Sequence, residues 1–316
     1  MSKPLVSAMI PTYKRPELVG TAINAVLAQS WRPLELIVIN DGSGDNTQEV
    51  LESFRPAAEQ AGVAYRCVET PNGGLGNART RALELAKGEF LAYDDDDDPW
   101  FPAKVEVQVN AMLATPDFGV SFTQYVHDGK PDQPKPRPEQ MQQGWVFPTL
   151  CTGDTRAHVQ TLMVHRRVYD KCGGFAPYPN FMDTHYNLKV ALEFQFLAVK
   201  QPLTTICTPP KTMSRAGGTE GDLKRDHIKL GVLRDFEAEF ASHPRFDKAA
   251  FAIQRARIYD EHVKHLLWLG RVDDAREAHT KAVQECGDQS MLRKLKRKLT
   301  RARIAGVFGL KLNKPE

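Results

Sequence analysis

An alternation of short apolar runs with amphipathic segments over residues 5–93 restricts the possible folds of this chain more than any other feature. Four apolar runs have the length of strands and begin about every 28 residues: 6–10, 34–39, 63–69 and 89–93. The segments between them repeat apolar residues at helical spacing, at 16–29, 45–58 and 77–86. Strands that alternate with helices predict right-handed βαβ units, and hence a parallel sheet with helices on its faces.

Beyond Trp100 the alternation weakens, and the pattern predicts a mixture of elements. We expect a helix at 102–114, strands at 120–126 and 159–165, a surface loop at 130–144, a helix or helix–strand at 185–198, and helices from Leu223 onward. The predicted fold class is α/β, with a mostly parallel sheet flanked by helices and a C-terminal helical extension.

The composition is that of an ordinary soluble globular protein, with 41% hydrophobic and 26% charged residues among 316. No apolar run approaches the roughly 18 residues of a membrane span, and the N-terminus lacks the apolar stretch of a signal peptide. The five cysteines are widely spaced and form no CxxC pair, which predicts reduced thiols rather than disulfides or a zinc site. We therefore expect a cytoplasmic protein.

The C-terminal segment 291–316 is strongly basic, with nine Lys and Arg residues against one acid, in a chain whose net charge is only +3. Several small or apolar residues share one helical face: Leu292, Leu295, Leu299, Ala302 and Gly306. Such a helix can lie on an anionic membrane surface, on the inner face of the plasma membrane, or pack on the body or on a second subunit. Nucleic-acid binding is not favoured, because no aromatic-rich basic face accompanies the segment.

The stretch LAYDDDDDPW (91–100) places five consecutive aspartates directly after the fourth predicted strand. Neighbouring carboxylates repel one another by about 1 kcal/mol per pair at about 4 Å in water. A divalent cation with oxygen ligands relieves this repulsion, and ligands of open α/β sheets bind at the carboxyl ends of the strands. The other reading is a solvated acidic turn, or acids that stabilise a helix N-terminus.

Two further strand-end loops carry residues suited to a nucleotide. NDGSGD (40–45) ends the second strand, and the Asp41 carboxylate there can accept a hydrogen bond from a base N–H or a ribose hydroxyl. Asp45 is better explained as a helix cap. NGGLGNARTRA (72–82) opens a helix with glycines and Arg79, which suits phosphate oxygens.

Five segments resemble, in their order and spacing, the family 2 glycosyltransferases with the GT-A fold: IPTYKRPELVGTAINAVLAQSW, LELIVINDGSGD, NGGLGNARTRAL, GEFLAYDDDDDPWFPAKVE and KCGGF. The resemblance covers about residues 5–200. It implies a Rossmann-like sheet and an inverting, metal-dependent transfer of a sugar from a nucleotide-diphosphate donor, expected to be a UDP-sugar. The acceptor it implies is a hydroxyl of a glycan or lipid-linked molecule, and the cofactor Mn²⁺ or Mg²⁺.

The resemblance also assigns roles in donor binding. It implies nucleotide contacts for a set of strand-end residues: Pro11, Thr12, Tyr13, Asp41, Arg79, Asp95 and Asp96. It implies that Asp97 binds the metal, with Asp98 beside it. Asp94 occupies a place usually held by an apolar residue, so the resemblance gives it no role.

The acceptor half matches the family pattern less well. The family's Glu-Asp pair after GGF aligns with Met182 and Asp183, which makes Asp183 the implied general base. His185 is the competing candidate, although a structural histidine is the simpler reading. The loop around Ser214, Arg215 and Thr219 resembles the segment that closes over the diphosphate in related enzymes.

These expectations divide the chain into three parts. Residues 1–100 form the nucleotide-sugar half, 101–222 the acceptor half, and 223–316 the helical extension. Two other functions compete with this interpretation. A sugar-phosphate nucleotidyltransferase would normally show a Gly-rich basic loop after the first strand, where this chain has PTYKRPE. A non-catalytic scaffold that acts through its helical C-terminus would not need the Asp41, Arg79, Asp95 and Asp97 set.

Overall fold

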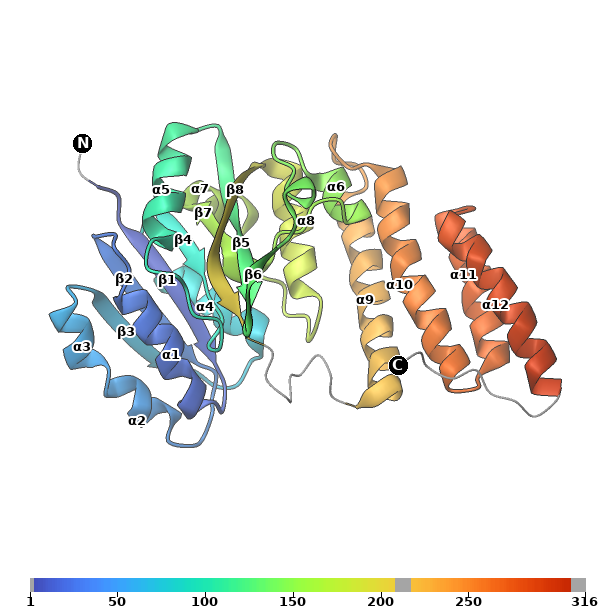
Figure 1. Ribbon diagram of the computed structural model, residues 1–316, viewed down its shortest axis with the longest axis horizontal. Helices are drawn as coiled ribbons and strands as arrows, with labels where there is room; N and C mark the ends of the chain where they lie inside the picture. The colour runs from blue at the N-terminus through green and yellow to red at the C-terminus, as the bar shows by residue number, and fades with distance from the viewer. Residues whose placement is uncertain (1–2, 208–216, 308–316) are drawn as a thin grey trace. The chain divides into compact units, whose positions relative to one another are not determined.

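The computed structural model describes residues 3–207 and 217–307, with side chains described as far as Thr300. The chain divides into two compact units. The first comprises Met1–Val146 and Asp154–Thr208 and contains the sheet; the second comprises Phe147–Gly153 and Pro209–Glu316 and is helical where it is described (Figure 1).

The sheet of the first unit has eight strands: β1 (Val6–Thr12), β2 (Leu34–Asn40), β3 (Ala64–Glu69), β4 (Phe90–Tyr93), β5 (Phe118–His127), β6 (Lys130–Lys135), β7 (Leu162–His165) and β8 (Gln195–Ile206). Their order is β3-β2-β1-β4-β7-β5-β6, with β8 paired to β5. The first four strands are parallel, and Val6 of β1 pairs with both Leu34 of β2 and Phe90 of β4. The predicted α/β fold, with its parallel sheet over 5–93, is therefore confirmed.

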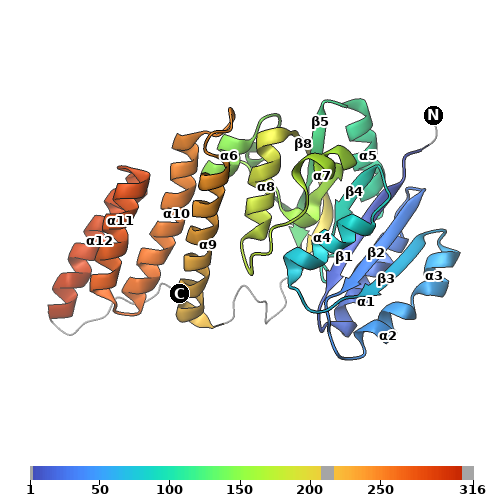
Figure 2. The same cartoon turned by 180° about the vertical axis from the view of Figure 1, so that it is seen from behind.

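Helices cover both faces of this sheet. They are α1 (Pro16–Leu27), α2 (Thr47–Glu52), α3 (Arg55–Gln60), α4 (Leu75–Leu85), α5 (Lys104–Ala114), α7 (Arg166–Cys172) and α8 (Met182–Glu193). The helix α1 lies in front of β1 and β2 in Figure 1, and α4 lies over the opposite face in Figure 2. Every residue of β1 and β2 is buried, as expected for parallel strands that are covered on both sides.

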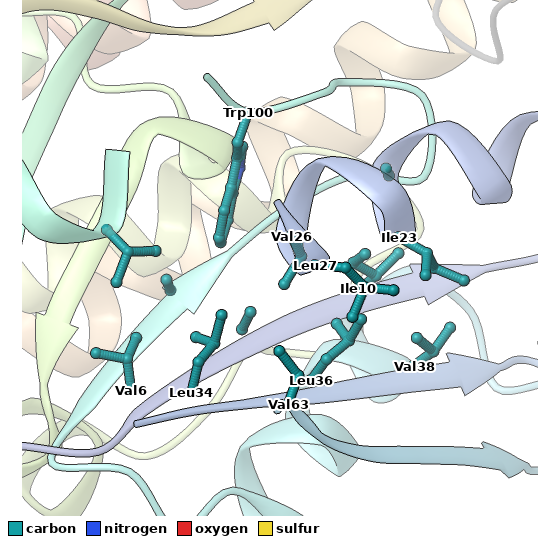
Figure 3. Close-up of a cluster of buried hydrophobic side chains, with 14 of the residues drawn as sticks. Val6, Ile10, Ile23, Val26, Leu27, Leu34, Leu36, Val38, Val63 and Trp100 are labelled. Carbon is teal, nitrogen blue, oxygen red and sulfur yellow. The ribbon is translucent and has the colours of Figure 1, made fainter. Parts of the chain in front are cut away.

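The core between α1 and the sheet explains why the strands and helices of this half could be predicted from the spacing of apolar residues. Figure 3 shows Ile10 and Leu36 of the strands beneath Ile23 and Val26 of α1. Each such side chain contributes about 1.5–3 kcal/mol when it is fully buried. The indole of Trp100, at the end of the aspartate run, joins the same cluster. The acidic loop is thus anchored to the core at its C-terminal end.

The structure differs from the sequence prediction in three places. The segment expected as a loop at 130–144 contains β6 and a 3-10 helix, η1 (Pro138–Gln140). As an edge strand, β6 accommodates its prolines, because a proline needs no ladder partner there. The helix expected over 45–58 is split into α2 and α3, and part of the strand expected at 159–165 is a 3-10 helix, η2 (Val159–Thr161).

The second unit consists of α6 (Phe147–Thr152), α9 (Gly218–Phe240), α10 (Lys248–Trp268), α11 (Val272–Cys286) and α12 (Ser290–Val307). Leu292, Leu295 and Leu299 of α12 are buried in a cluster with residues of α10 and α11. The three leucines of this apolar face therefore pack on the protein, as the alternative reading of the segment expected. None of the helices in the described parts of the chain is long and apolar enough to cross a membrane.

Candidate active site

The carboxyl ends of the parallel strands bring the predicted donor loops together. Thr12, at the end of β1, donates from Oγ1 to Oδ2 of Asp96 at 2.7 Å. The backbone N–H of Lys14 donates to Oγ of Ser43, which follows β2, at 2.9 Å. Pro11 is buried within β1, whereas the Tyr13 ring is 42% exposed. The loops after β1, β2 and β4 are therefore linked by hydrogen bonds, with one aromatic ring open to solvent.

Asp41 fastens the loop after β2 to the glycine-rich loop after β3. Its two carboxylate oxygens accept from the backbone N–H groups of Gly73 and Gly74, both at 2.8 Å. Gly42 has a φ of +66°, and a Cβ there would lie 2.6 Å from the backbone nitrogen of Asn72. Only glycine therefore allows this close approach of the two loops.

Three of the five aspartates pair with two arginines. Arg15 donates from Nη1 to Oδ1 of Asp96 at 2.8 Å and to Oδ2 of Asp97 at 3.1 Å. Arg79 donates to Oδ1 of Asp95 at 2.5 Å. Burial raises the pKa of Asp96 to about 6, although Thr12 and Arg15 oppose the rise. The protein itself thus supplies positive charge to the run.

The two outer aspartates, Asp94 and Asp98, are buried, and Asp98 has partners in other elements. Asp98 accepts from Nε2 of Gln160 and from the backbone N–H of Cys207, both at 2.8 Å, and so joins the loop to η2 and to the end of β8. Burial, with the nearby Asp95 charge, raises its pKa to about 7. Burial also raises the pKa of Asp94 well above its ordinary value.

Lys104, whose charge interacts with that of Asp94, has no surface exposed. Its Nζ donates to Oε1 of Gln108 at 2.8 Å and lies 4.2 Å from the centre of a Trp100 ring. Burial lowers the pKa of Lys104 to about 7, while the charge of Asp94 opposes that change.

Arg79 is the central group of the site. It is buried on α4, and its guanidinium pairs with Asp95 on one side and with Asp183 on the other. The Phe175 ring lies 5.3 Å from the guanidinium carbon. Arg79 therefore links the aspartate run, through a single side chain, to the residue expected to act as the general base.

Asp183 sits in the first turn of α8, and the KCGGF segment positions that helix. A Cβ on Gly174 would lie 2.5 Å from Oγ1 of Thr80, so this glycine lets the segment pack against α4. Phe181, just before α8, has a left-handed φ of +67°, which is unusual for a bulky residue and is found at functional sites.

The environment of Asp183 combines access with altered acidity. Its side chain keeps 47% of its surface exposed, enough to meet an incoming group. Desolvation raises the pKa of Asp183, and the Arg79 charge opposes the rise. Met182, at the position where a glutamate was expected, is buried. His185 is also buried, with its ring 5.4 Å from that of Tyr178, in line with a structural role.

Some expected residues lie elsewhere, and some contributors were missed. Ser214 and Arg215 fall outside the described residues, and Thr219 belongs to α9 of the second unit. Arg15, Lys104 and Gln160 were not anticipated. Asking which cations balance five aspartates would have pointed to Arg15, which stands in the PTYKR turn at the end of the first strand. Only the fold brings Lys104 and Gln160 to their partners, and no pattern in the nearby sequence indicates these contacts.

The aspartate run can hold a divalent cation through one or two carboxylates. Among residues 3–207 and 217–300, no group of three or more His, Cys, Asp or Glu side chains is arranged to hold a metal ion. Asp95 and Asp97 keep 26% and 14% of their side-chain surface exposed, so one or two carboxylates are accessible. This suits Mg²⁺ or Mn²⁺, which commonly take one or two carboxylates and complete their shell with phosphate oxygens and water.

The chain was compared with known protein families and sequences. The sequence profile of Glycosyl transferase family 2 matches residues 7–179. The putative teichuronic acid biosynthesis glycosyltransferase TuaG of Bacillus subtilis (strain 168) is 35% identical over 132 residues, which are 41% of this chain and 51% of that protein. The uncharacterized glycosyltransferase YibD of Escherichia coli (strain K12) is 32% identical over 108 residues, 34% of this chain and 30% of that protein. The chain thus covers about half or less of these curated relatives.

Solved structures share the fold. S. aureus TarS superposes with a TM-score of 0.64 at 17% identity, covering 96% of this chain and 53% of TarS. A mannosyltransferase from Pyrobaculum calidifontis, in complex with GDP-Man and Mn²⁺, gives a TM-score of 0.62 at 20% identity, covering 96% of this chain and 81% of that one. TarS residues 1–349 in complex with UDP-GlcNAc give 0.57 at 16% identity, with 93% and 92% covered.

Proposed function

This chain belongs to glycosyl transferase family 2, and from that premise we propose that it moves a sugar from a UDP-sugar to a hydroxyl of a glycan or lipid-linked acceptor, with inversion at the anomeric carbon. One observation carries the proposal. Arg79 pairs with Asp95 of the aspartate run and with Asp183 of α8, so the expected donor and acceptor sides share one buried guanidinium.

Donor binding is assigned to residues 1–100, at the carboxyl ends of β1 to β4. The exposed ring of Tyr13 offers a surface for the base, and the buried Pro11 and Thr12 are proposed to shape the turn that holds it. Asp41 has both carboxylate oxygens on backbone N–H groups, and each oxygen keeps a lone pair for a ribose hydroxyl or base N–H. Solved structures of similar fold hold UDP-GlcNAc in one case and GDP-Man in another, which supports a nucleotide-diphosphate sugar as the donor class.

A divalent cation completes the donor site in this proposal. Asp97 would hold Mn²⁺ or Mg²⁺, with Asp95 and Asp96 beside it for the nucleotide. When bound, the cation would neutralise charge that develops on the departing diphosphate. The proposal is supported by the accessible carboxylates and by the Mn²⁺ in the Pyrobaculum calidifontis complex.

Acceptor activation is assigned to Asp183, within the acceptor half 101–222. The acceptor oxygen forms its bond to the anomeric carbon while its proton passes to the Asp183 carboxylate. The bond from the anomeric carbon to the diphosphate breaks in the same step, and the diphosphate leaves with the electron pair. The Asp183 carboxylate is exposed enough to receive this proton.

The acceptor itself is proposed only as a class. One relative is named for teichuronic acid biosynthesis, which supports a role in building a polysaccharide. Residues 223–316 are proposed as an extension that brings the enzyme to an anionic surface at the inner membrane face. Because Leu292, Leu295 and Leu299 are buried, this attraction would be electrostatic and would not involve insertion of that apolar face.

Calorimetric titration with UDP, GDP, dTDP and CMP, with and without Mn²⁺, tests the donor assignment. We expect tight binding of UDP only in the presence of Mn²⁺. Asp97→Asn should lose this Mn²⁺-dependent UDP binding, whereas Asp117→Asn, at an exposed position outside the site, should leave binding unchanged. Failure of every nucleotide to bind, with or without metal, would contradict the proposed function.

A further inference from the structure

The turn after β1 holds a positive charge directly against the carboxylate assigned to the metal. One nitrogen of Arg15, Nη1, contacts both Asp96 and Asp97, at 2.8 and 3.1 Å. The Arg15 side chain is 29% exposed, so one side of the pair remains open to solvent. A cation bound to Asp97 would therefore place a second positive charge close to the Arg15 guanidinium.

The backbone determines where Arg15 points. Lys14 has a φ of +53°, an uncommon left-handed conformation for a residue with a side chain, and its N–H is bound by Ser43. Pro16 then begins α1, and Arg15 is the residue that precedes this first turn. The turn is thus anchored on both sides of Arg15, and its contact with the aspartates is a feature of the local fold.

A second comparison shows that Arg15 differs from Arg79. Arg79 is fully enclosed and is held by Asp95, Asp183 and Phe175, so it has little room to move. Arg15 is partly exposed and is held by the two aspartates through one nitrogen only, which leaves the rest of its fork free for other acceptors. Of the two, Arg15 is the one able to change partners.

We propose that Arg15 is a built-in counter-cation of the donor-free enzyme, which competes with the divalent metal for Asp97 and releases it when a nucleoside diphosphate arrives. This inference rests on the proposed function. A guanidinium and a divalent cation repel each other at one carboxylate, so metal alone binds weakly. Diphosphate oxygens attract both cations and give the guanidinium fork a new bidentate partner. Metal and nucleotide would therefore bind cooperatively, and Arg15 would be a positioning residue for the donor.

The test measures Mn²⁺ binding directly, from the electron paramagnetic resonance signal of free Mn²⁺, with and without saturating UDP. Without UDP, Arg15→Gln and Arg15→Met should bind Mn²⁺ about tenfold more tightly than the wild type. Arg15→Lys, which keeps the charge, should stay near the wild type. Arg81→Gln is the matched control, because Arg81 is an exposed arginine paired with Glu84 outside the site.

Measurements with UDP distinguish failure of the Arg15 inference from failure of the proposed metal dependence. UDP should increase Mn²⁺ affinity strongly in the wild type and much less in Arg15→Gln, because that variant has no competing cation to release. Equal Mn²⁺ affinities of wild type and both neutral variants without UDP would overturn the inference alone, provided that UDP still promotes Mn²⁺ binding. Absence of Mn²⁺ binding in every protein, even with UDP, would overturn the metal dependence of the proposed function as well. Circular dichroism establishes that each variant is folded, and two neutral substitutions guard against the loss of one.

Discussion

At the scale of single residues, buried and half-buried cations govern the chemistry of the aspartate run. Arg15 contacts Asp96 and Asp97, and Arg79 contacts Asp95. Repulsion among the carboxylates is therefore already reduced before any ligand binds. A divalent cation is not needed to explain why the run is tolerated, and its role is confined to the proposed chemistry.

The proposed base is tested by Asp183→Asn. The amide cannot accept the acceptor proton, so the rate of sugar transfer should fall by about 10²–10⁴-fold, the usual contribution of a general base. Binding of UDP with Mn²⁺ should change little, because the amide retains an oxygen for Arg79. Transfer rates and calorimetric UDP affinity are measured on the same preparation. Near-normal transfer by this variant would show that another group removes the proton.

Lys104 makes a prediction about stability and pH. Its folded-state pKa of about 7 lies below the ordinary value of a lysine, so between about pH 7 and 10 the unfolded chain binds more protons than the folded one. Lys104 by itself should therefore make the free energy of unfolding rise with pH over this range, by up to about 1.4 kcal/mol per unit, whereas the raised pKa of Asp94 acts in the opposite direction.

Urea unfolding at several pH values, followed by tryptophan fluorescence, measures this slope, because Trp100 lies against Lys104. Lys104→Met should remove most of the rise, whereas Lys87→Met, at an exposed lysine, should keep it. A slope that is the same in Lys104→Met and in the wild type would show that Lys104 is not the group responsible.

At the scale of elements, the loops at the carboxyl ends of the strands depend on a few backbone positions. Gly42 and Gly44 both have left-handed φ values, +66° and +67°, but only Gly42 is close to another chain segment. Substitutions at Gly42 and Gly44 therefore distinguish the cost of backbone strain, which both would have, from the cost of a steric clash, which only Gly42 would have. Both glycines lie in the loop that presents Asp41 to Gly73 and Gly74.

Gly44→Ala should cost about 1 kcal/mol of unfolding free energy, because a side chain is strained at positive φ but meets open space. Gly42→Ala should cost more and should also weaken UDP binding, because its Cβ would push Asn72 and the glycine-rich loop away. Urea unfolding and UDP titration compare the two variants. Equal effects of the two substitutions on both measurements would count against a role for loop closure in donor binding.

The elements also show which parts of the fold could be predicted. The parallel half could be predicted because β1 and β2 are buried throughout, and α1 has apolar residues at helical spacing that pack into the same core. β6 was not, because a proline-rich edge strand looks like a loop when its partner is unknown. The strand-end loops met as expected, since parallel strands place their ends together. Arg15 and Lys104 escaped notice because their partners are brought to them by the fold.

At the scale of the whole molecule, one face of the basic helix α12 packs against α10 and α11. Leu292, Leu295 and Leu299 are buried, while Lys296 and Arg297 line a groove of about 860 Å³ between α11 and α12. Association with vesicles containing anionic phosphatidylglycerol should therefore depend on charge. It should fall steeply as ionic strength rises through about 0.1 M, where the Debye length is about 10 Å.

Vesicle sedimentation over a salt series measures this association, with neutral phosphatidylcholine vesicles as the control. Lys296→Glu combined with Arg297→Glu should lower binding at every salt concentration. Binding that persists at high salt would indicate insertion of apolar side chains, and absence of binding at low salt would remove the membrane from the proposed function.

The short helix α6 has a consequence for any attempt to dissect this protein. Residues Phe147–Gly153 belong to the helical unit although the sequence on both sides of them belongs to the sheet. The Phe147 ring is stacked on Phe236 and Phe251, and almost none of it is exposed. A gene cut after codon 208 would therefore encode the sheet-containing unit with the Phe147 ring exposed at its surface. Such a fragment should self-associate less once Phe147 is replaced by a polar residue, because one cut in the gene leaves α6 on the wrong unit.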